Sequence, residues 1–226
     1  MSLDGVRILV AGATGELGGR AVAELARRGA ALAVAGRDRG RLVSAARTGG
    51  DAPMRRFDAY ALDQCAELGP WAAGELGGLD GVLVTVGVAG FGPAASTPDA
   101  VGEHLLTVNA LCPMAVLRGA LPALTDGGFL AAVTGRIVDR PLRGTADLAA
   151  SKAALGCWLG VLGREVKDRG VLVLDLRPPH LATGFAGRAV AGSAPALPAG
   201  ADPARETVAW ADRLTAHMAQ RRVRTG

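Results

Sequence analysis

Aromatic side chains are scarce in this chain: Phe, Trp and Tyr make up 4% of its 226 residues, and Tyr60 is its single tyrosine. Proteins that bind single-stranded nucleic acid stack bases on aromatic rings, so this scarcity argues against that class. The formal net charge of +4 comes mainly from arginines scattered through predicted helices. Their one cluster, at Arg221, Arg222 and Arg224, is typical of a solvated chain end. We therefore expect no nucleic-acid partner.

Cysteine and long apolar runs are also rare. Cys65, Cys112 and Cys157 are odd in number and widely spaced, so they predict neither a disulfide framework nor a zinc site, and we expect no bound metal. No uninterrupted apolar run reaches the roughly 18 residues that span a bilayer. The start, MSLDGVRILV, lacks the charged segment and apolar stretch of a signal peptide. We therefore expect a cytoplasmic protein that binds no membrane.

Half of the residues are hydrophobic, enough for one globular domain over residues 1–226 with a large core. Short apolar runs alternate with amphipathic stretches. The runs that predict strands are 7–11, 32–35, 54–57, 81–86, 129–134 and 171–175, and the stretches that predict helices are 16–28, 39–47, 62–73, 101–124, 147–169 and 204–221. Such alternation builds a parallel sheet covered by helices on both faces. The predicted fold class is α/β, a Rossmann-like doubly wound sheet.

The first predicted strand ends in a glycine-rich turn, AGATGELGGR, where glycine recurs every three residues. Strand, glycine turn and helix is an arrangement that holds a pyrophosphate, because glycine admits close backbone approach and the helix start offers free N–H groups. The spacing G-x-x-G-x-x-G departs from the dinucleotide fingerprint, and a tight turn that needs glycine only for packing is the alternative. The residues predicted to bind the cofactor here are Gly12, Thr14, Gly15, Glu16, Leu17 and Gly18.

The second predicted strand ends at Gly36-Arg37-Asp38, where a dinucleotide fold meets the adenosine ribose. A carboxylate at this corner binds the ribose 2′-hydroxyl, whereas an arginine accommodates a 2′-phosphate. Arg37 therefore favours NADP(H) over NAD(H), with a surface arginine that binds no ligand as the alternative. Asp38 is better explained as the N-cap of the next helix. Asp58 follows the third predicted strand, where it would reach the adenine amino group or cap a turn.

Six segments in order give residues 5–190 a resemblance to the short-chain dehydrogenase/reductase family. They are the glycine loop, Gly36-Arg37, VLVTVGVAGFGP at 82–93, Val108-Asn109, LAASKAAL at 148–155 and RPPHLAT at 177–183. The third resembles the family's fourth strand and its Asn-Asn-Ala-Gly turn, and the fifth is similar to its active-site helix Tyr-x-x-x-Lys. The last is similar to the Pro-Gly…Thr loop beside the nicotinamide.

The resemblance implies roles for individual residues. In that family a Tyr hydroxyl exchanges a proton with the substrate oxygen, and a Lys four residues later binds the nicotinamide ribose. An Asn orders a relay water, and a Ser holds the substrate oxygen. Lys152 and Asn109 match the Lys and the Asn, and Gly87 and Thr183 are expected beside the cofactor.

The proton donor itself is missing. Leu148 stands at the Tyr position, and the Ser position falls at Gly135 with Thr134 beside it. General acid catalysis contributes typically 10²–10⁴-fold, which an alkyl group cannot supply. His180, in the loop that resembles the nicotinamide-side loop, is the best candidate replacement, because imidazole titrates near neutral pH. Lys152 is a second candidate if burial lowers its pKa, and the Thr134 hydroxyl is a poor acid.

Residues 183–203, rich in Gly, Ala and Pro, are expected to form a lid over the site or a plain connecting loop. The resemblance further implies a homodimer through the helices at 101–124 and 147–169. We expect an NADP(H)-binding oxidoreductase acting on an unknown small-molecule carbonyl or alcohol substrate by an atypical mechanism. Two alternatives stay open. One is a non-redox catalyst such as a cyclase, dehydratase or isomerase, and the other is an inactive nucleotide sensor or partner subunit.

Overall fold

The fold is a six-stranded parallel sheet, described by a computed structural model over residues 2–225. The strands lie in the order β3-β2-β1-β4-β5-β6, and each neighbouring pair is parallel. Their bounds are β1 Arg7–Ala11, β2 Ala31–Gly36, β3 Met54–Arg56, β4 Leu79–Val84, β5 Leu124–Val133 and β6 Leu172–Leu176. The order reverses between β1 and β4, so the carboxyl ends of these strands form the crevice where ligands bind in such folds. The predicted doubly wound class is confirmed.

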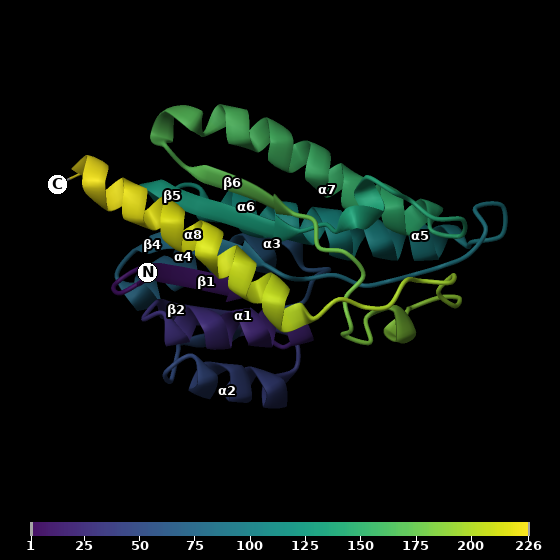
Figure 1. The fold of residues 1–226 in the computed structure, drawn as a ribbon, viewed down its shortest axis with the longest axis horizontal. Coiled ribbons are helices and arrows are strands. Elements are labelled where there is room, and N and C mark those ends of the chain that lie inside the picture. The colour runs from purple at the N-terminus through teal and green to yellow at the C-terminus, as the bar shows by residue number, and fades with distance from the viewer. Residues whose placement is uncertain (1, 226) are drawn as a thin grey trace.

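Helices cover both faces of the sheet (Figure 1). The α-helices are α1 Glu16–Arg27, α2 Arg39–Thr48, α3 Leu62–Ala66, α4 Leu68–Leu76, α5 Asp99–Leu106, α6 Cys112–Ala120, α7 Ala146–Glu165 and α8 Pro203–Thr225. Buried side chains of α1, α2 and α8 pack on one face, and those of α3, α4, α6 and α7 pack on the other. Three 3₁₀ turns lie at Arg136–Val138, Lys167–Arg169 and Ala186–Arg188.

Strand β1 contributes side chains to the hydrophobic cores on both faces of the sheet. Ile8 and Val10 pack into the cluster beneath α1 and α8, whereas Leu9 and Ala11 pack into the cluster on the opposite face. Successive strand residues point to opposite faces, and a sheet covered on both sides needs apolar residues at every position. This is why the predicted strand over residues 7–11 reads as a continuous apolar run.

Element boundaries differ from the predicted ones in several places. The predicted helix 62–73 is two helices, α3 and α4, that meet at Glu67. Pro70 lies in the first turn of α4 and has no N–H to donate to a carbonyl four residues back, which favours a restart there. Strand β4 is two residues earlier than expected, β5 begins already at Leu124, and α7 ends at Glu165 before a 3₁₀ turn.

The long helix predicted over 101–124 is irregular at its centre. It runs from Asp99 to Ala120 through a π segment, Thr107–Leu111, where the Cys112 N–H donates to the Thr107 carbonyl five residues back. Pro113 explains the irregularity, because a proline removes the hydrogen bond to the carbonyl four residues before it and clashes with it. That carbonyl belongs to Asn109, so the backbone is disturbed at a predicted site residue.

The same helix corrects the expectation that no segment is apolar enough to cross a membrane. By length and hydropathy, Asp99–Ala120 meets that requirement, but half of its most apolar window is buried inside the fold. A core helix of a globular protein passes the same test. The expected solvated tail is also revised, because Arg221 forms an ion pair with Asp80 at 2.8 Å. The side chains of Arg222 and Arg224 lie outside the described residues.

Candidate active site

The glycine loop lies at the carboxyl end of β1. Gly12 has a φ of +93°, and a Cβ there would lie 2.7 Å from Thr85 Oγ1. A Cβ on Gly18 would lie 2.2 Å from the Gly12 carbonyl oxygen. Both glycines are therefore required by packing alone. Gly15 differs, because its nearest neighbour would be 3.4 Å away, so packing does not explain this glycine.

The start of α1 beside Gly15 is open to an anion. Gly15 is the N-cap and no side chain caps the helix, while the Gly19 N–H is already bonded to the Gly15 carbonyl. The N–H groups of Glu16, Leu17 and Gly18 precede the helix's own hydrogen-bond ladder. Backbone donors and the helix dipole together favour a negative group there. The loop thus fits a dinucleotide pyrophosphate, in a place where a side chain at residue 15 would stand in the way.

The corner after β2 joins the glycine loop to Arg37. A Cβ on Gly36 would lie 2.5 Å from Thr14 Cγ2, so Thr14 packs directly on the end of β2. Arg37 is exposed, and its backbone carbonyl accepts a hydrogen bond from Arg56 Nε at 3.0 Å. Two guanidinium-bearing residues therefore meet at this corner. Asp38 caps α2 by accepting from the Arg41 N–H at 2.9 Å, as its position predicts.

Asp58 is engaged in a turn. Its Oδ1 accepts from the Tyr60 N–H at 3.0 Å, which is the turn-capping alternative stated for this residue. The Tyr60 hydroxyl pairs with Nδ1 of His104 on α5. The single phenol of the chain thus lies in the turn after β3 and is bound to α5.

Lys152 is buried on α7, with 5% of its surface exposed. Its Nζ donates to the Val133 carbonyl at the end of β5, at 3.1 Å. A Cβ on Gly87 would lie 2.8 Å from Nζ and 3.2 Å from Asn109 Oδ1, so the backbone of Gly87 runs directly against both residues. Burial lowers the pKa of Lys152 to about 8, although the charge of Asp175 acts in the opposite direction. An amine with this pKa exchanges protons close to neutral pH.

Asn109 is fully buried and acts as a clamp. Its Oδ1 accepts from the Val88 N–H at 2.9 Å, and its Nδ2 donates to the Val88 carbonyl at 3.0 Å and to Ser151 Oγ at 3.1 Å. The side-chain amide therefore ties the loop after β4 to α7. Since Pro113 has no N–H, the Asn109 backbone carbonyl has no donor four residues ahead of it in the helix.

Thr134 points to a carboxylate. Its Oγ1 donates to Asp175 on β6, so the hydroxyl expected beside the substrate is already engaged. The next residue, Gly135, has a φ of +105°. A side chain is strained in this conformation, so the position that corresponds to the family's serine has a backbone unsuited to one.

Leu148 lies in a small apolar cluster of its own. Ala89, Phe91, Leu105 and Leu148 are its buried members, and Phe185 and other residues after β6 pack against them. Leu148 is 6% exposed. The residue at the position of the family's tyrosine is thus packed among hydrocarbon side chains.

The segment 183–203 is docked on this cluster. The Val190 N–H donates to the Ala89 carbonyl at 2.8 Å, and the Phe91 N–H donates to the Ala191 carbonyl at 2.9 Å. On its other side, the Gly92 N–H donates to the Gly144 carbonyl at 2.9 Å. Residues 89–92 therefore join the lid segment to the loop between β5 and α7.

The two remaining predicted residues lie at the base of this segment. Thr183 is buried, and its Oγ1 accepts from the Phe185 N–H at 3.4 Å. The His180 carbonyl accepts from the Ala201 N–H at 2.8 Å. The His180 ring is half-buried, and among residues 2–225 its side chain makes no hydrogen bond. Its backbone joins the two ends of the segment 183–203.

Sequence reasoning missed several residues of the site. Thr85 Oγ1 donates to the Gly12 carbonyl at 3.2 Å and so fixes the glycine loop. Ser151 holds Asn109, and Asp175 holds Thr134. Only Asp175 carried a signal, because it is a charged residue inside the apolar strand LVLDL. Thr85 and Ser151 are ordinary in their local context, and their roles depend on distant segments.

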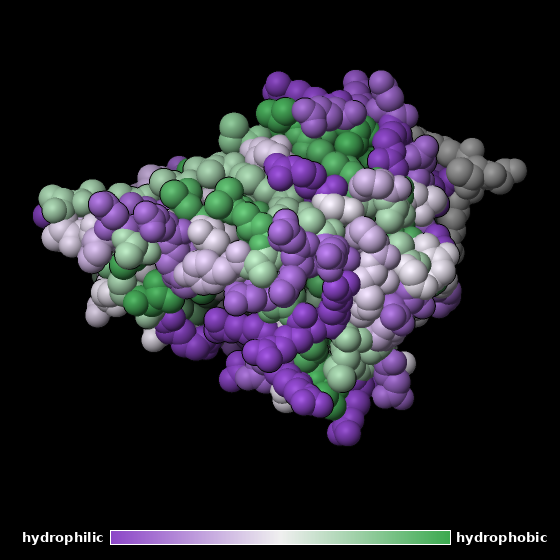
Figure 2. Space-filling model, turned by 180° about the vertical axis from the view of Figure 1, so that it is seen from behind, coloured by the Kyte–Doolittle hydropathy of each residue, from purple (hydrophilic) through white to green (hydrophobic). Residues whose placement is uncertain are grey.

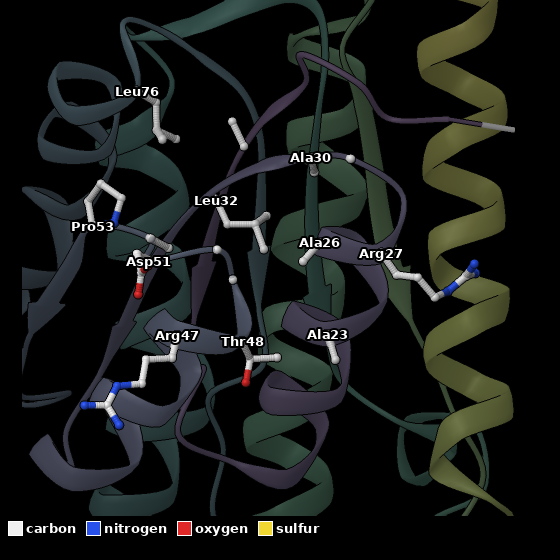
Figure 3. Close-up of a pocket in the computed structure, with 15 residues that line it drawn as sticks. Ala23, Ala26, Arg27, Ala30, Leu32, Arg47, Thr48, Asp51, Pro53 and Leu76 are labelled. Atoms are coloured by element: carbon white, nitrogen blue, oxygen red, sulfur yellow. The ribbon is translucent and has the colours of Figure 1, made fainter.

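A hollow of about 720 Å³ lies elsewhere, between the ends of α1 and α2 (Figure 3). Its labelled lining includes Ala26, Arg27, Leu32, Arg47 and Pro53. These residues stand at the amino ends of β2 and β3, opposite the crevice at the carboxyl ends. The hollow is wide open to solvent, and Arg27 is paired with Glu24 at 2.8 Å. The chemistry-bearing residues are all at the other edge, which we take as the site.

Comparisons with known proteins show the family and the fold of this chain. The family model described as short chain dehydrogenase matches residues 7–193. An uncharacterised NAD-dependent oxidoreductase of Mycobacterium tuberculosis is 29% identical over 131 residues, which are 57% of this chain and 44% of that protein. The chain thus spans less than half the length of this relative. An uncharacterised oxidoreductase of Myxococcus xanthus is 30% identical over 176 residues, 75% of this chain and 70% of that one.

A solved structure shares the fold over nearly the whole chain. The short-chain dehydrogenase from Burkholderia cenocepacia, in complex with NADP, superposes with a TM-score of 0.85 over 95% of this chain and 92% of that chain. The two sequences are 22% identical, so the likeness is one of fold.

Proposed function

Because this chain belongs to the short-chain dehydrogenase family, we propose that it is an oxidoreductase that binds a nicotinamide dinucleotide along the carboxyl ends of β1, β2 and β4. The observation that carries the proposal is the start of α1. Gly15 has no packing reason to be glycine, and the free N–H groups after it have no side-chain cap. A phosphate group supplies the partner that this helix end lacks.

We propose that NADP(H) is preferred over NAD(H). Arg37 is exposed at the end of β2, and Arg56 lies against its carbonyl. Guanidinium groups suit a 2′-phosphate, and Asp38, the nearest carboxylate in sequence, is occupied as an N-cap. Related proteins are named both ways, one as NAD-dependent and one in complex with NADP, so the preference rests on the two arginines.

When bound, the nicotinamide supplies or accepts the hydride. In our proposal the chain's own residues bind the cofactor and hold the surrounding loops in place. Lys152 presents its ammonium beside Gly87 to the cofactor ribose, while Asn109 holds Val88 and so keeps the loop after β4 in place. Leu148 and the docked lid exclude water. The proton for a substrate oxygen then comes from Lys152, whose lowered pKa suits a general acid near neutral pH. His180 is the second candidate.

Calorimetric titration with NADPH and NADH tests the binding proposal. We expect NADPH to bind more tightly, and Arg37→Ala and Arg56→Ala to weaken NADPH by about tenfold or more each with little effect on NADH. Gly15→Val is expected to abolish binding of both, because it blocks the helix start. Gly74→Ala, on α4 with nothing within 4 Å of its Cβ, is the matched control. No binding of either dinucleotide to the unaltered protein contradicts the proposal.

A second candidate function is favoured by Leu148. An apolar wall where the family places its proton donor suits a non-redox reaction, or nucleotide binding without turnover, better than hydride transfer. Incubation with NADPH and a panel of carbonyl compounds separates the two functions. Stoichiometric cofactor oxidation supports the oxidoreductase, and turnover without oxidation supports the non-redox catalyst. Binding without any turnover supports the sensor or partner subunit.

We also propose a cytoplasmic homodimer that contacts α5, α6 and α7 of a second copy. Exposed apolar side chains on this stretch, at 43–47% exposure, are Leu106, Leu111 and Val161. Figure 2 views the face opposite to that of Figure 1, and hydrophobic side chains gather in its upper part, where α7 lies. The apolar helix Asp99–Ala120 is then covered by the fold on one side and by the partner copy on the other.

A further inference from the structure

Asp175 places a carboxylate on the covered face of the sheet. In β6, Leu174 and Leu176 pack into the cluster beneath α8. Asp175 lies between them and therefore points to the opposite face, which α7 covers. Its backbone is in register with Ala132 of β5, so Thr134, two residues further along, points to the same face. The alternation that makes β6 apolar on one side thus brings Asp175 and Thr134 together.

Two side chains bind the carboxylate. It accepts from the Thr134 hydroxyl, and its Oδ2 accepts from Arg177 Nε at 2.7 Å. Arg177 in turn donates to Asp139, just after the 3₁₀ turn at 136–138. On α7, Gly156 makes the space, because a Cβ there would lie 3.0 Å from Asp175 Oδ2. A leucine or alanine at residue 156 would press on this cluster.

Burying a charge beneath a helix is unfavourable unless it is paired. Lys152 precedes Gly156 by four residues, so both lie on the same face of α7. Gly156 lies against Asp175 of β6, so this face packs on β6. Asp175 is the charged group whose field raises the pKa of Lys152 against the effect of burial. Within the described residues, the other charges of this cluster are Arg177 and Asp139, and they lie beyond Asp175.

Thr134 links the same carboxylate to the backbone that holds the lysine. Lys152 Nζ donates to the carbonyl of Val133, and Thr134 is the next residue. The Thr134 N–H donates to the Leu176 carbonyl at 3.0 Å, so the residues after Asp175 on β6 also fix this point. The anchor of Lys152 and its nearest counter-charge therefore belong to one hydrogen-bonded unit.

We propose that Asp175 is a positioning residue for Lys152: its carboxylate is the counter-charge of the buried ammonium on the face that α7 covers and, through Thr134, it fixes the β5 carbonyl to which that ammonium is bound. The use of this arrangement for holding a cofactor ribose rests on the proposed function. The coupling between Asp175 and Lys152 does not rest on it.

The chain contains two lysines, Lys152 and Lys167, so their charge can be followed residue by residue. Protein labelled with ¹³C at the lysine ε-carbon is titrated by NMR between pH 6 and 11 without cofactor, with the exposed Lys167 as internal reference. In the unaltered protein we expect the Lys152 midpoint to lie well below that of Lys167. Asp175→Asn lowers the Lys152 midpoint by about one pH unit. Arg177→Gln raises it, because the remaining carboxylate is less neutralised.

The Lys152 midpoint is thus expected to fall in Asp175→Asn and to rise in Arg177→Gln. A purely structural role of Asp175 would not shift the midpoint in opposite directions in the two variants. Asp80→Asn is the matched control, since Asp80 is a buried carboxylate bound by Arg7 and Arg221 at the other end of the sheet. It is expected to destabilise the fold and leave the Lys152 midpoint unchanged. An unchanged midpoint in folded Asp175→Asn, or shifts of the same sign in both variants, overturns the proposal. If Asp175→Asn does not fold, a midpoint that fails to rise in Arg177→Gln overturns it.

A cofactor titration separates this inference from the proposed function. We expect Asp175→Asn to weaken NADPH binding at pH 8 by about tenfold, and Asp80→Asn to leave it unchanged. If the unaltered protein binds no dinucleotide, the proposed function fails while the NMR titration still decides the coupling. If NADPH binds equally well to both variants, the positioning role is refuted and dinucleotide binding stands.

Discussion

Lys152 combines an ordinary location with an unusual environment. It lies within a helix, as its sequence neighbours predict, but it is nearly sealed from water and bound to a backbone carbonyl. Burial disfavours the charged form of a lysine, which accounts for the lowered pKa. In our proposal the same side chain serves as a ribose-binding cation when it is protonated and as a source of protons near neutral pH.

This environment predicts a pH-dependent stability. The pKa of Lys152 is about 8 in the folded chain, against 10.5 for the unperturbed group. Between these values the unfolded chain binds a proton that the native lysine has released, so stability rises with pH across this window. The gain amounts to about 3 kcal/mol and is complete near pH 10.5. Urea unfolding of the unaltered protein and of Lys152→Met from pH 7 to 10.5 measures it. A stability difference that stays flat across the window contradicts the prediction.

Leu148 is the residue that separates this chain from its family's chemistry. Leu148→Tyr places a phenol four residues before Lys152, on the same helix face. We expect NADPH-dependent carbonyl reduction to rise about 10²-fold, and the melting temperature to fall because a larger ring enters a packed cluster. Leu148→Phe adds the ring without the hydroxyl and is the control. Equal rates for the two variants would refute the view that a missing phenol limits the proposed carbonyl reduction.

At the scale of elements, the segment 183–203, which we propose as a lid, is held by backbone geometry. Gly192 has a φ of +63°, and a Cβ there would lie 2.0 Å from the Phe91 carbonyl oxygen. The two backbone hydrogen bonds to Ala89 and Phe91 depend on this close approach. A small residue at one point of the loop therefore keeps the apolar cluster around Leu148 covered.

Gly192→Ala is expected to undock the lid at a cost of about 1–3 kcal/mol. Limited proteolysis measures the result, with cleavage within residues 183–203 at least several-fold faster than in the unaltered protein. Gly187→Ala, in the same segment, has nothing within 4 Å of its Cβ, and its cleavage rate should match that of the unaltered protein. Equal protection of all three proteins would show that Gly192 does not hold the lid.

The π segment is a second element whose form follows from a single residue. Pro113 interrupts the hydrogen bonds of the long helix at Asn109, and the π segment absorbs the extra residue. The Asn109 side chain, on this segment, hydrogen-bonds the backbone of Val88 in the loop after β4. π-bulges occur frequently at functional sites, and this one adjoins Lys152.

At the scale of the whole molecule, self-association is predicted by the exposed apolar side chains of α5, the π segment and α7. We call Leu106, Leu111 and Val161 together the apolar stripe. We expect light scattering to give the mass of a dimer. Leu111→Glu and Val161→Glu place charges on the stripe and are expected to give monomers, because a charge buried at an interface without a partner is unfavourable. Val190→Glu alters an equally exposed valine on the lid and should leave the dimer intact. A monomeric or tetrameric unaltered protein contradicts this prediction.

Much of the fold was predictable because its signals are local. The alternation of apolar runs with amphipathic stretches gave the strand and helix order, and the N-cap role of Asp38 follows from its place before α2. Two of the differences from the predicted helices involve proline. Pro70 restarts a helix and Pro113 distorts one, and in both cases neighbouring helices keep the interrupted segments aligned.

The sequence by itself determined the sheet, its glycine loop and the absence of a tyrosine before Lys152, because each depends on residues adjacent along the chain. Only the tertiary structure decided which groups surround that lysine. Asp175 follows Lys152 by 23 residues, and Val133 precedes Lys152 by 19 residues. Their meeting depends on the register of β5 with β6 and on the space left by Gly156. Register and packing between distant segments are set by the whole core, so no local sequence pattern predicts them.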